Sequence, residues 1–388
     1  MSSWKDYRLS DLMQIKYGKD HKHLANGKYP LYGSGGIMRF VEKPLYEDES
    51  ILIPRKGTLS NLFYLDQPFW SVDTMFYSKI NKELVFPKYL YYTLKTFDLA
   101  SLNVGSAVPS LTTEVLNEVL ITIPSLPTQK AIAEILSSLD DKIELNNQIN
   151  QNLEALAQAL FKQWFVDFEF PNENGEPYKS SGGEMIDSEL GEIPRDWKPS
   201  ILKDEFKINM GQSPKGETYN EIGEGMIFFQ GRTDFGFRFP SIRLFTTDPK
   251  KIARKGETLI SVRAPVGDIN RALEECCIGR GLGAIEEKNN HQFYTYYKIL
   301  SIQTELKSYD NEGTVFGSIN KDTLGGLKTI VPVLDLVERF DQLIKPIDDQ
   351  IETLSKETES LKNLRDTLLP KLISGELEVN ESLLEPTF

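Results

Sequence analysis

The sequence predicts an α+β protein in which two mixed α/β globular domains are joined by two long antiparallel coiled-coil helices, with a pseudo-two-fold internal repeat. Three observations support this fold class. The chain has 388 residues, which is too long for one ordinary domain. Its second half repeats the pattern of its first half. Two segments show apolar residues at heptad spacing, whereas the rest shows short apolar runs separated by turn residues.

The composition is that of a folded protein, with 40% hydrophobic and 26% charged residues. No run of about 18 apolar residues is present, so we expect no membrane-spanning helix. The polar N-terminus lacks an apolar targeting segment, and we expect a cytoplasmic protein. The two cysteines, Cys276 and Cys277, are adjacent and are not expected to form a disulfide.

The formal net charge of −13 by itself argues against a nucleic-acid partner. The charge is unevenly distributed, however. Residues 1–127 and 196–334 each carry a net charge of +1, whereas residues 128–195 carry −8 and residues 335–388 carry −7. The two long segments are therefore balanced, and either could present a basic face to DNA.

The repeat is visible from the start of each copy. Trp4 precedes Gly18 by 14 residues, and Trp197 precedes Gly211 by the same number, which gives an offset of 193. The offset changes farther along the chain, so the copies differ most in their first halves.

In the later part of each copy the offset is 208. It aligns Gly105–Leu111 with Gly313–Ile319, and it is kept through the following heptad segments. Arg55 aligns with Arg263 in the same register, and each follows a short apolar run. A constant offset over such a length predicts a duplication.

The charge pattern and the repeat give the domain boundaries. Residues 1–127 and 196–334 are predicted to be the globular domains, and residues 171–195, rich in Glu, Gly, Pro and Ser, the linker between the copies. Residues 128–170 and 335–377 are predicted to be long helices, followed by a tail at 378–388. Shorter helices are expected near Pro87–Phe97 and Phe293–Leu306.

In each predicted long helix, apolar residues recur in alternating steps of four and three, which is the coiled-coil pattern. Asn146 and Asn150 interrupt it. Buried asparagines would fix the register of the helices at a cost in stability, whereas the alternative is that they face solvent. The expected helix–helix seam consists of Leu136, Leu139, Ile143, Asn146, Asn150, Leu153, Leu160, Ile344, Ile347, Ile351, Leu354, Leu361 and Leu368.

The ends of these helices also have sequence signals. Pro171 is predicted to end the first helix and Gly375 the second. Asp335 followed by Glu338 suggests a capping box at the start of the second helix. Each helix would then have about 38 residues and a length of roughly 57 Å.

Basic and turn residues in the balanced segments are candidates for DNA contact. Arginine can form bidentate hydrogen bonds to guanine, and the N–H groups of Gly/Ser loops suit phosphate oxygens. The aligned pair Arg55 and Arg263 is the strongest, although the paired glycine loops could equally be structural. The candidates are Gly33, Ser34, Gly35, Arg39, Arg55, Lys56, Gly105, Ser106, Ser110, Gln230, Arg232, Arg263, Arg280, Gly313, Thr314 and Ser318. Further arginines of the second copy are Arg238, Arg243 and Arg271.

Catalytic and cofactor motifs are not found. Gly279–Gly283 superficially resembles a cofactor loop, but the residues after it extend a strand more readily than they begin a helix. A P-loop and the Asp/Asn-Pro-Pro-aromatic motif of a methyltransferase are missing. The three histidines lie outside any cluster with metal-ligand spacing. We expect no catalytic residue, metal or cofactor in this chain.

Four motifs resemble the DNA-specificity subunits of type I restriction-modification systems. They are Glu192–Lys198 (EIPRDWK) at the start of the second copy and Gly279–Gly283 (GRGLG) within it, Ala159–Phe168 (ALFKQWFVDF) after the first predicted helix, and Leu364–Leu377 (LRDTLLPKLISGEL) near the end of the chain. The resemblance covers essentially the whole chain.

This resemblance implies that the globular domains are target recognition domains. Each would bind one half of a bipartite, asymmetric site in double-stranded DNA, and the helices would set the spacing and bind two modification subunits. Those partners would methylate adenine with S-adenosylmethionine, and two restriction subunits that use ATP and Mg²⁺ can join such complexes. The chain itself would be non-catalytic.

Two alternatives stay open at this point. One is a scaffold whose globular domains bind proteins or glycans, which accounts for the acidity but not for the matched arginines. The other is a fused methyltransferase-nuclease, which the missing Pro-Pro motif disfavours.

Overall fold

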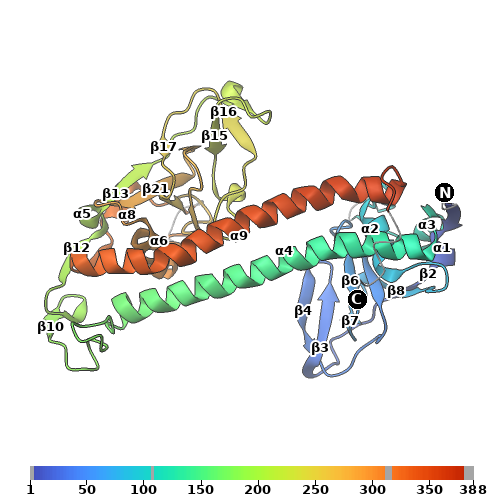
Figure 1. The fold of residues 1–388 in the computed structure, drawn as a ribbon, viewed down its shortest axis with the longest axis horizontal. Helices are drawn as coiled ribbons and strands as arrows, with labels where there is room; N and C mark the ends of the chain where they lie inside the picture. Colours follow the sequence, from blue (N-terminus) through green and yellow to red (C-terminus); the bar gives the residue numbers. More distant parts are fainter. Residues whose placement is uncertain (1–3, 106–108, 311–316, 380–388) are drawn as a thin grey trace, which may run out of the picture. The chain divides into compact units, whose positions relative to one another are not determined.

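The computed structural model describes residues 4–105, 109–310 and 317–379. The chain forms two compact units, residues 1–146 with 357–388 (unit 1) and residues 147–356 (unit 2). Each unit contains one globular domain and part of each of two long helices, α4 (Leu126–Phe161) and α9 (Leu334–Ser374) (Figure 1). Within the described part of the chain, no helix is both long and apolar enough to cross a membrane.

In the globular domain of unit 1, the described residues form three sheets, with strand orders β2-β8-β5-β6, β4-β3-β7 and β1-β9. Its elements are β1 (Lys5–Arg8), α1 (Leu9–Leu12), β2 (Met13–Tyr17), β3 (Asn26–Gly33), β4 (Gly36–Val41), β5 (Ser50–Pro54), β6 (Phe63–Leu65), β7 (Trp70–Ser71), β8 (Met75–Ile80), α2 (Pro87–Lys95), α3 (Thr113–Asn117) and β9 (Leu120–Ile123). Its main core joins α1, α2 and β5 to the long helices through Ile132, Leu136 and Leu372.

The sheets that the structure describes in unit 2 are four, with strand orders β13-β21-β18-β19, β14-β16-β15-β20-β17, β12-β22 and β10-β11. Its elements are a π-helical turn (Lys162–Val166), β10 (Met185–Ser188), β11 (Gly191–Pro194), β12 (Lys198–Ile201), α5 (Leu202–Glu205), β13 (Phe206–Met210), a 3₁₀ turn (Gly216–Thr218), β14 (Tyr219–Asn220), β15 (Met226–Phe229), a 3₁₀ turn (Arg232–Asp234), β16 (Leu244–Thr246), β17 (Ile252–Ala253), β18 (Thr258–Ser261), β19 (Ile269–Arg271), β20 (Cys276–Ile278), β21 (Leu282–Glu287), α6 (Gln292–Ser301), α7 (Gln303–Ser308), α8 (Lys321–Gly325) and β22 (Lys328–Val331).

The internal repeat is present in the strand pairing. In unit 1, β1 pairs antiparallel with β9 so that Lys5 faces Ile123, and in unit 2, β12 pairs with β22 so that Lys198 faces Val331. The offsets of these pairs are 193 and 208, as the sequence predicts. The sheets β2-β8-β5 and β13-β21-β18 follow the same order. The two globular domains are therefore copies of one architecture.

The long helices are antiparallel within each unit. In unit 1, Arg365 of α9 donates to Asp140 of α4 at 2.7 Å, and Asn146 donates to Glu357 at 2.9 Å. As residue numbers rise on one helix, they fall on the other. Because Asn146 is fully buried, it lies inside the helix pair rather than facing solvent.

The same holds in unit 2. The Nδ2 of Asn150 lies 3.3 Å from the hydroxyl of Ser355, and the rings of Phe161 and Phe340 lie 5.7 Å apart. Asn150 is 3% exposed and is also inside the pair. Both asparagines occupy the positions expected for residues that fix helix register.

Part of the predicted seam is displaced by one residue. Leu153 and Leu160 are only partly buried, whereas their neighbours Glu154 and Phe161 are buried. An α-helix has 3.6 residues per turn, so its buried face drifts from a strict heptad unless the helix supercoils. The seam residues that are buried are Leu136, Ile143, Asn146, Asn150, Ile344, Ile351 and Leu354, and those that are partly buried are Leu139, Ile347, Leu361 and Leu368.

The first long helix ends earlier than predicted. Its α-helical part stops at Phe161, and after the π-helical turn Phe168 adopts a left-handed conformation with φ of 62°. Pro171 therefore does not end it. The chain turns early because Trp164, Phe165 and Phe168 enter the core of unit 2, where Phe165 and Phe168 pack against Trp197.

Three smaller expectations also change. α9 begins at Leu334, so Asp335 lies in its first turn, where an acidic side chain favours the helix dipole, and not at a capping-box position. The predicted linker contains the hairpin β10–β11. The helix expected near Phe293–Leu306 is divided into α6 and α7. Gly375, with φ of 75°, follows the last helical residue as predicted.

Candidate nucleic-acid interface

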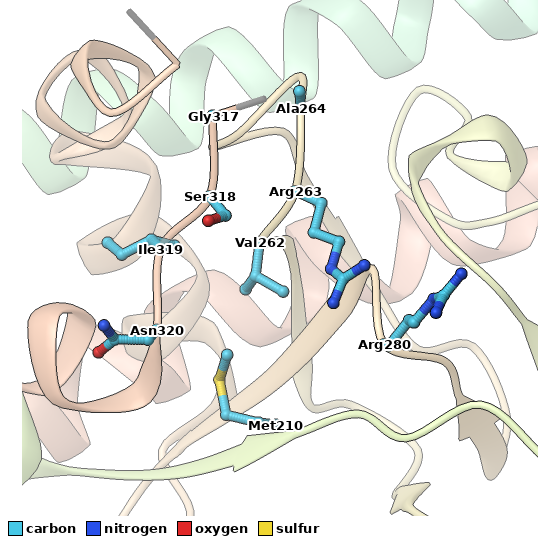
Figure 2. A pocket seen from close by; sticks show the side chains of 9 residues that line it. All are labelled: Met210, Val262, Arg263, Ala264, Arg280, Gly317, Ser318, Ile319 and Asn320. Carbon is cyan, nitrogen blue, oxygen red and sulfur yellow. The ribbon is translucent and has the colours of Figure 1, made fainter. Parts of the chain in front are cut away.

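A hollow of about 560 Å³ in unit 2 brings together residues that the sequence analysis selected separately (Figure 2). Arg263 follows β18, and Arg280 lies in the turn between β20 and β21. Both side chains are exposed, and neither forms an ion pair with a residue that the structure describes. The hollow is lined by Met210, Val262, Arg263, Ala264, Arg280, Gly317, Ser318, Ile319 and Asn320.

The backbone around Arg263 is held by a short antiparallel bridge to Ser318. The N–H of Ile319 donates to the carbonyl of Val262, and the N–H of Ala264 donates to the carbonyl of Gly317, both at 3.0 Å. A cationic side chain and a serine hydroxyl are thereby fixed at the edge of one hollow. Both groups can hydrogen-bond to phosphate oxygens.

Unit 1 contains the counterpart of this bridge. Lys56 is bridged to Ser110, with the N–H of Leu111 donating to Arg55 at 2.9 Å and the N–H of Gly57 donating to Pro109 at 3.2 Å. Lys56 is exposed and has no ion-pair partner among the described residues. The geometry of unit 2 is thus reproduced with lysine in place of arginine.

A hollow of about 410 Å³ lies near this bridge in unit 1. Ser34 connects the two features, because a Cβ on Gly57 would lie 3.4 Å from its hydroxyl oxygen. The hollow is lined by His21, Gly33, Ser34, Gly35, Met38, Val72, Asp73 and Thr74. Three of the predicted candidates, Gly33, Ser34 and Gly35, therefore lie together.

The predicted equivalence of Arg55 with Arg263 is wrong by one residue. The N–H of Arg55 donates to Thr74, and the equivalent bond in unit 2 is donated by Val262 to Gly281, both at 2.9 Å. The offset in this region is therefore 207, and the structural counterpart of Arg263 is Lys56. The guanidinium of Arg55 instead lies 5.6 Å above the ring of Tyr17.

Among the other candidates, Arg39, Arg232 and Gly105 have partners within the fold. Arg39 donates to the backbone carbonyls of His21, at 2.7 Å, and Leu24, at 3.1 Å, and Arg232 forms an ion pair with Asp268 at 2.5 Å. The backbone of Gly105 accepts and donates bonds with Asn103. Gln230 is exposed next to the Arg280 turn. Ser106, Gly313 and Thr314 lie outside the described residues.

The arginines of the second copy separate into two groups. Arg238 and Arg271 are buried and paired with Asp348, and Arg243 pairs with Asp234 at 3.0 Å. Together with Arg232, these side chains are engaged by carboxylates. Arg263 and Arg280 have no such partner in the part of the chain that is described, and they share one hollow.

Asp73 was not selected from the sequence. It lies in the turn before β8, which corresponds to the turn that contains Arg280 before β21. An alignment at offset 207 would have paired these two residues. Among the described residues, no group of His, Cys, Asp and Glu has the arrangement of a metal site.

Comparison with known proteins agrees with this architecture. A family model described as the type I restriction modification DNA specificity domain matches residues 1–155 and 194–363. The chain therefore belongs to the type I restriction-modification DNA specificity family. Each matched stretch contains one copy of the repeat, and each includes one basic–serine pair. Members of this family are DNA-recognition components and not catalytic subunits.

Two relatives of this specificity-family chain are informative. A putative type I restriction enzyme MjaX specificity subunit from Methanocaldococcus jannaschii is 35% identical over 311 residues, which are 77% of this chain and 70% of that protein. The type I restriction enzyme HindI specificity subunit from Haemophilus influenzae is 25% identical over 369 residues, 76% and 79% of the respective chains.

A solved structure supports the fold. The crystal structure of a type I restriction-modification system S subunit from M. genitalium superposes with a TM-score of 0.66 at 20% identity, and the match covers 96% of each chain. At this identity the likeness shows that the two specificity-family chains share a fold.

Proposed function

We propose that this chain directs a type I restriction-modification complex to a bipartite, asymmetric site in double-stranded DNA, with the globular domain of each unit binding one half. The observation that carries this proposal is the matched bridge of a basic residue and a serine in each unit, Lys56 with Ser110 and Arg263 with Ser318. Each bridge lies at or near a hollow, and its cation is free of carboxylates among the described residues. Such groups are suited to the DNA backbone.

The net charge limits how strongly the isolated chain can bind DNA. With a net charge of −13 it lacks the surplus of basic residues that strong DNA binding needs. We propose that partner subunits supply the remaining basic surface. The isolated chain should therefore bind its site weakly at physiological salt, and nanomolar, sequence-specific binding by the isolated chain would contradict this part of the proposal.

The long helices are proposed to set the spacing of the half-sites and to bind two modification subunits. Leu156 of α4 is 49% exposed, and Leu364 of α9 is 47% exposed. Their numbers differ by 208, so they are equivalent positions of the repeat. Two equivalent exposed leucines suit two copies of one partner. S-adenosylmethionine is proposed to bind to the modification subunits, and ATP and Mg²⁺ to restriction subunits where these are present.

Docking can be tested by co-purification with the modification subunit. Leu156→Asp and Leu364→Asp should each reduce the bound partner from two copies to one, and the double variant should bind neither copy. Gln151→Asp is a matched control, because Gln151 is also exposed on α4 and the change adds the same charge. Unchanged stoichiometry in the double variant would rule out these positions.

The main test is methylation-aware sequencing of the source genome with the gene intact, deleted and restored. We expect one bipartite motif to lose adenine methylation on deletion and to regain it on restoration. Restoration with Lys56→Ala or Arg263→Ala should give less methylation at the same motif. A methylation map that is independent of the gene, together with purification of the chain without a methyltransferase, would favour the scaffold alternative.

A further inference from the structure

The two globular domains carry opposite charges at one equivalent backbone position. Asp73 occupies the turn between β7 and β8 in unit 1, and Arg280 occupies the turn between β20 and β21 in unit 2. Both turns are closed by the same backbone hydrogen bond. The N–H of the first residue of the next strand donates to the carbonyl of the residue just before the charged one. These bonds join Met75 to Val72 and Leu282 to Gly279, and each is 2.9 Å long.

The two turns are anchored to equivalent neighbouring strands. The N–H of Val72 donates to Tyr32 of β3 at 3.0 Å, and the N–H of Gly279 donates to Phe229 of β15 at 2.8 Å. The strands β3 and β7 pair in parallel, as do β15 and β20. The charged residue therefore projects from the same place in both domains.

The turns are also held from the other side by a glycine. The N–H of Gly18 donates to Met75, and the N–H of Gly211 donates to Leu282, both at 2.9 Å. A Cβ on Gly18 would overlap the carbonyl of Val72, and a Cβ on Gly211 would overlap that of Gly279. Because the backbones pack this closely, each turn is held on two sides, and we expect its side chains to be positioned in advance of binding.

Neither charge is paired within the part of the chain that the structure describes. Asp73 and Arg280 are both exposed, and neither side chain forms an ion pair or hydrogen bond with a described residue. Asp73 lines the hollow of unit 1, and Arg280 lines that of unit 2. In Figure 2 the side chain of Arg263 extends toward the turn that carries Arg280, and the side chain of Arg280 extends from that turn away from Arg263. Two exposed guanidinium groups without a carboxylate partner among the described residues are suited to a ligand rich in hydrogen-bond acceptors.

A second equivalent position, near the first, has the same sign of charge in both domains. Lys56 and Arg263 are equivalent, and both are basic and exposed. A residue that binds a phosphate is useful in both half-sites, because the backbone of DNA is the same in both. A residue that contacts a base is expected to differ where the half-sites differ. The contrast between the two positions separates these two roles.

We propose that Asp73 and Arg280 are base-contacting residues that make the two half-sites different, whereas Lys56 and Arg263 bind phosphates. This inference rests on the function proposed above and assigns specificity to named residues. Arg280 donates two hydrogen bonds to O6 and N7 of a guanine in the major groove. Asp73 accepts a hydrogen bond from the N4 amino group of a cytosine.

Asp73 could not take the place of a phosphate-binding residue or of a guanine-binding arginine. A carboxylate next to DNA phosphates is repelled, so Asp73 can be favourable only where a base edge presents a donor. Facing the two acceptors of guanine, it would be left without a partner. A base contact of this kind discriminates against the wrong base by about 10- to 100-fold. Loss of a phosphate contact weakens binding to all sequences alike.

The test uses the complete complex and a DNA library with both half-sites randomised. Arg280→Ala is expected to relax the preference at a guanine in one half-site by about 10-fold or more, and Asp73→Ala to relax a cytosine in the other half-site. Arg280→Lys keeps the charge and should also relax the guanine, because it loses the bidentate geometry. Lys56→Ala and Arg263→Ala are the matched controls, and they should reduce binding without changing any base preference.

The results distinguish failure of the proposed function from failure of the roles assigned to Asp73 and Arg280. If the wild-type complex selects no bipartite site, the proposed function fails. If it selects one, but Arg280→Ala and Asp73→Ala leave every base preference unchanged, the function stands and the inference is overturned. A uniform loss of binding by Arg280→Ala that Arg280→Lys restores would also overturn it, since this is the behaviour of a phosphate contact. Melting temperatures of the variants should equal that of the wild type, because both side chains are exposed.

Discussion

Replacing Arg238 by methionine should destabilise unit 2 more than any exposed arginine replacement. The side chain of Arg238 is 1% exposed. It donates to Glu154 of α4 at 2.9 Å and to Asp348 of α9, and its guanidinium lies 3.5 Å above the ring of Tyr296. A single buried cation thus connects the globular domain of unit 2 to both helices of that unit.

The size of the stability loss depends on which carboxylate loses its ion-pair partner. Asp348 still accepts from Arg271, and methionine preserves most of the packing of the arginine stem. Among the described residues, Glu154 keeps the hydroxyl of Tyr297, at 3.3 Å, and the amide of Gln158, at 2.9 Å. Removing one partner of a buried ion pair costs about 3–5 kcal/mol. For a unit of this size we expect the melting temperature to fall by roughly 6–20 °C.

Equilibrium denaturation and calorimetry of the full chain measure this effect. Arg195→Met is the control, because Arg195 forms an exposed ion pair with Glu184 and should leave the unfolding transition unchanged. The double variant Arg238→Met with Glu154→Gln should recover about 1–2 kcal/mol, because it removes the unpaired charge. A loss below about 1 kcal/mol, or a double variant no more stable than Arg238→Met, would refute the reasoning.

Three further predictions concern stability. Burial raises the pKa of Glu205 above its ordinary 4.5, against the opposing effects of Lys298 and Tyr294, so wild-type stability falls as the pH rises through that raised pKa. Glu205→Gln should flatten this decline, giving a more stable protein at pH 8 and a nearly unchanged one at pH 4 in denaturation at both pH values. Asn146→Leu should stabilise unit 1 by about 1 kcal/mol, because the buried Oδ1 of Asn146 has no hydrogen-bond partner among the described residues; reduced stability would mean that the bond to Glu357 outweighs this cost. Gly18→Ala and Gly211→Ala should each cost about 2–3 kcal/mol in chemical denaturation, because the added methyl group overlaps a backbone carbonyl, and wild-type stability of either variant would show that the turn can move.

The sequence predicted the fold best where a regular pattern of residues corresponds to a regular structure. The heptad segments and the glycine that ends α9 could be predicted because each depends on residues close in sequence, and the two offsets could be predicted because the two copies keep similar sequence patterns. The buried asparagines of the helix pair were also identified, since a polar residue at a seam position interrupts a regular apolar pattern.

The one-residue error between Arg55 and Arg263 has a physical cause. Both residues follow short runs of apolar residues, and such runs match equally well when one is displaced by a single position. Backbone hydrogen bonds remove this ambiguity, because the bond of Arg55 to Thr74 has its counterpart in Val262. A shift by one residue in an extended segment turns each side chain to the opposite face. The error therefore exchanged a half-buried position with an exposed one.

Long-range partners account for the other differences. Glu154 occupies a buried helix position because Arg238 reaches it from a loop 84 residues away in sequence. No periodicity within α4 could indicate that a carboxylate would be buried there. In the same way, α4 ends early because its aromatic residues pack against Trp197, which belongs to the next repeat.

The same pairing explains why net charge was a poor guide to the partner. Part of the acidity of the helices is neutralised internally, since Asp140 accepts from Arg365 and Asp348 from two arginines of unit 2. DNA contact depends on which cations remain without a carboxylate and where the backbone holds them, and not on the sum of all charges. In unit 2 Arg263 and Arg280 remain unpaired within the described structure, and they line one hollow. A chain with a net charge of −13 can thus present a local cationic site, provided that its acidic residues are engaged elsewhere.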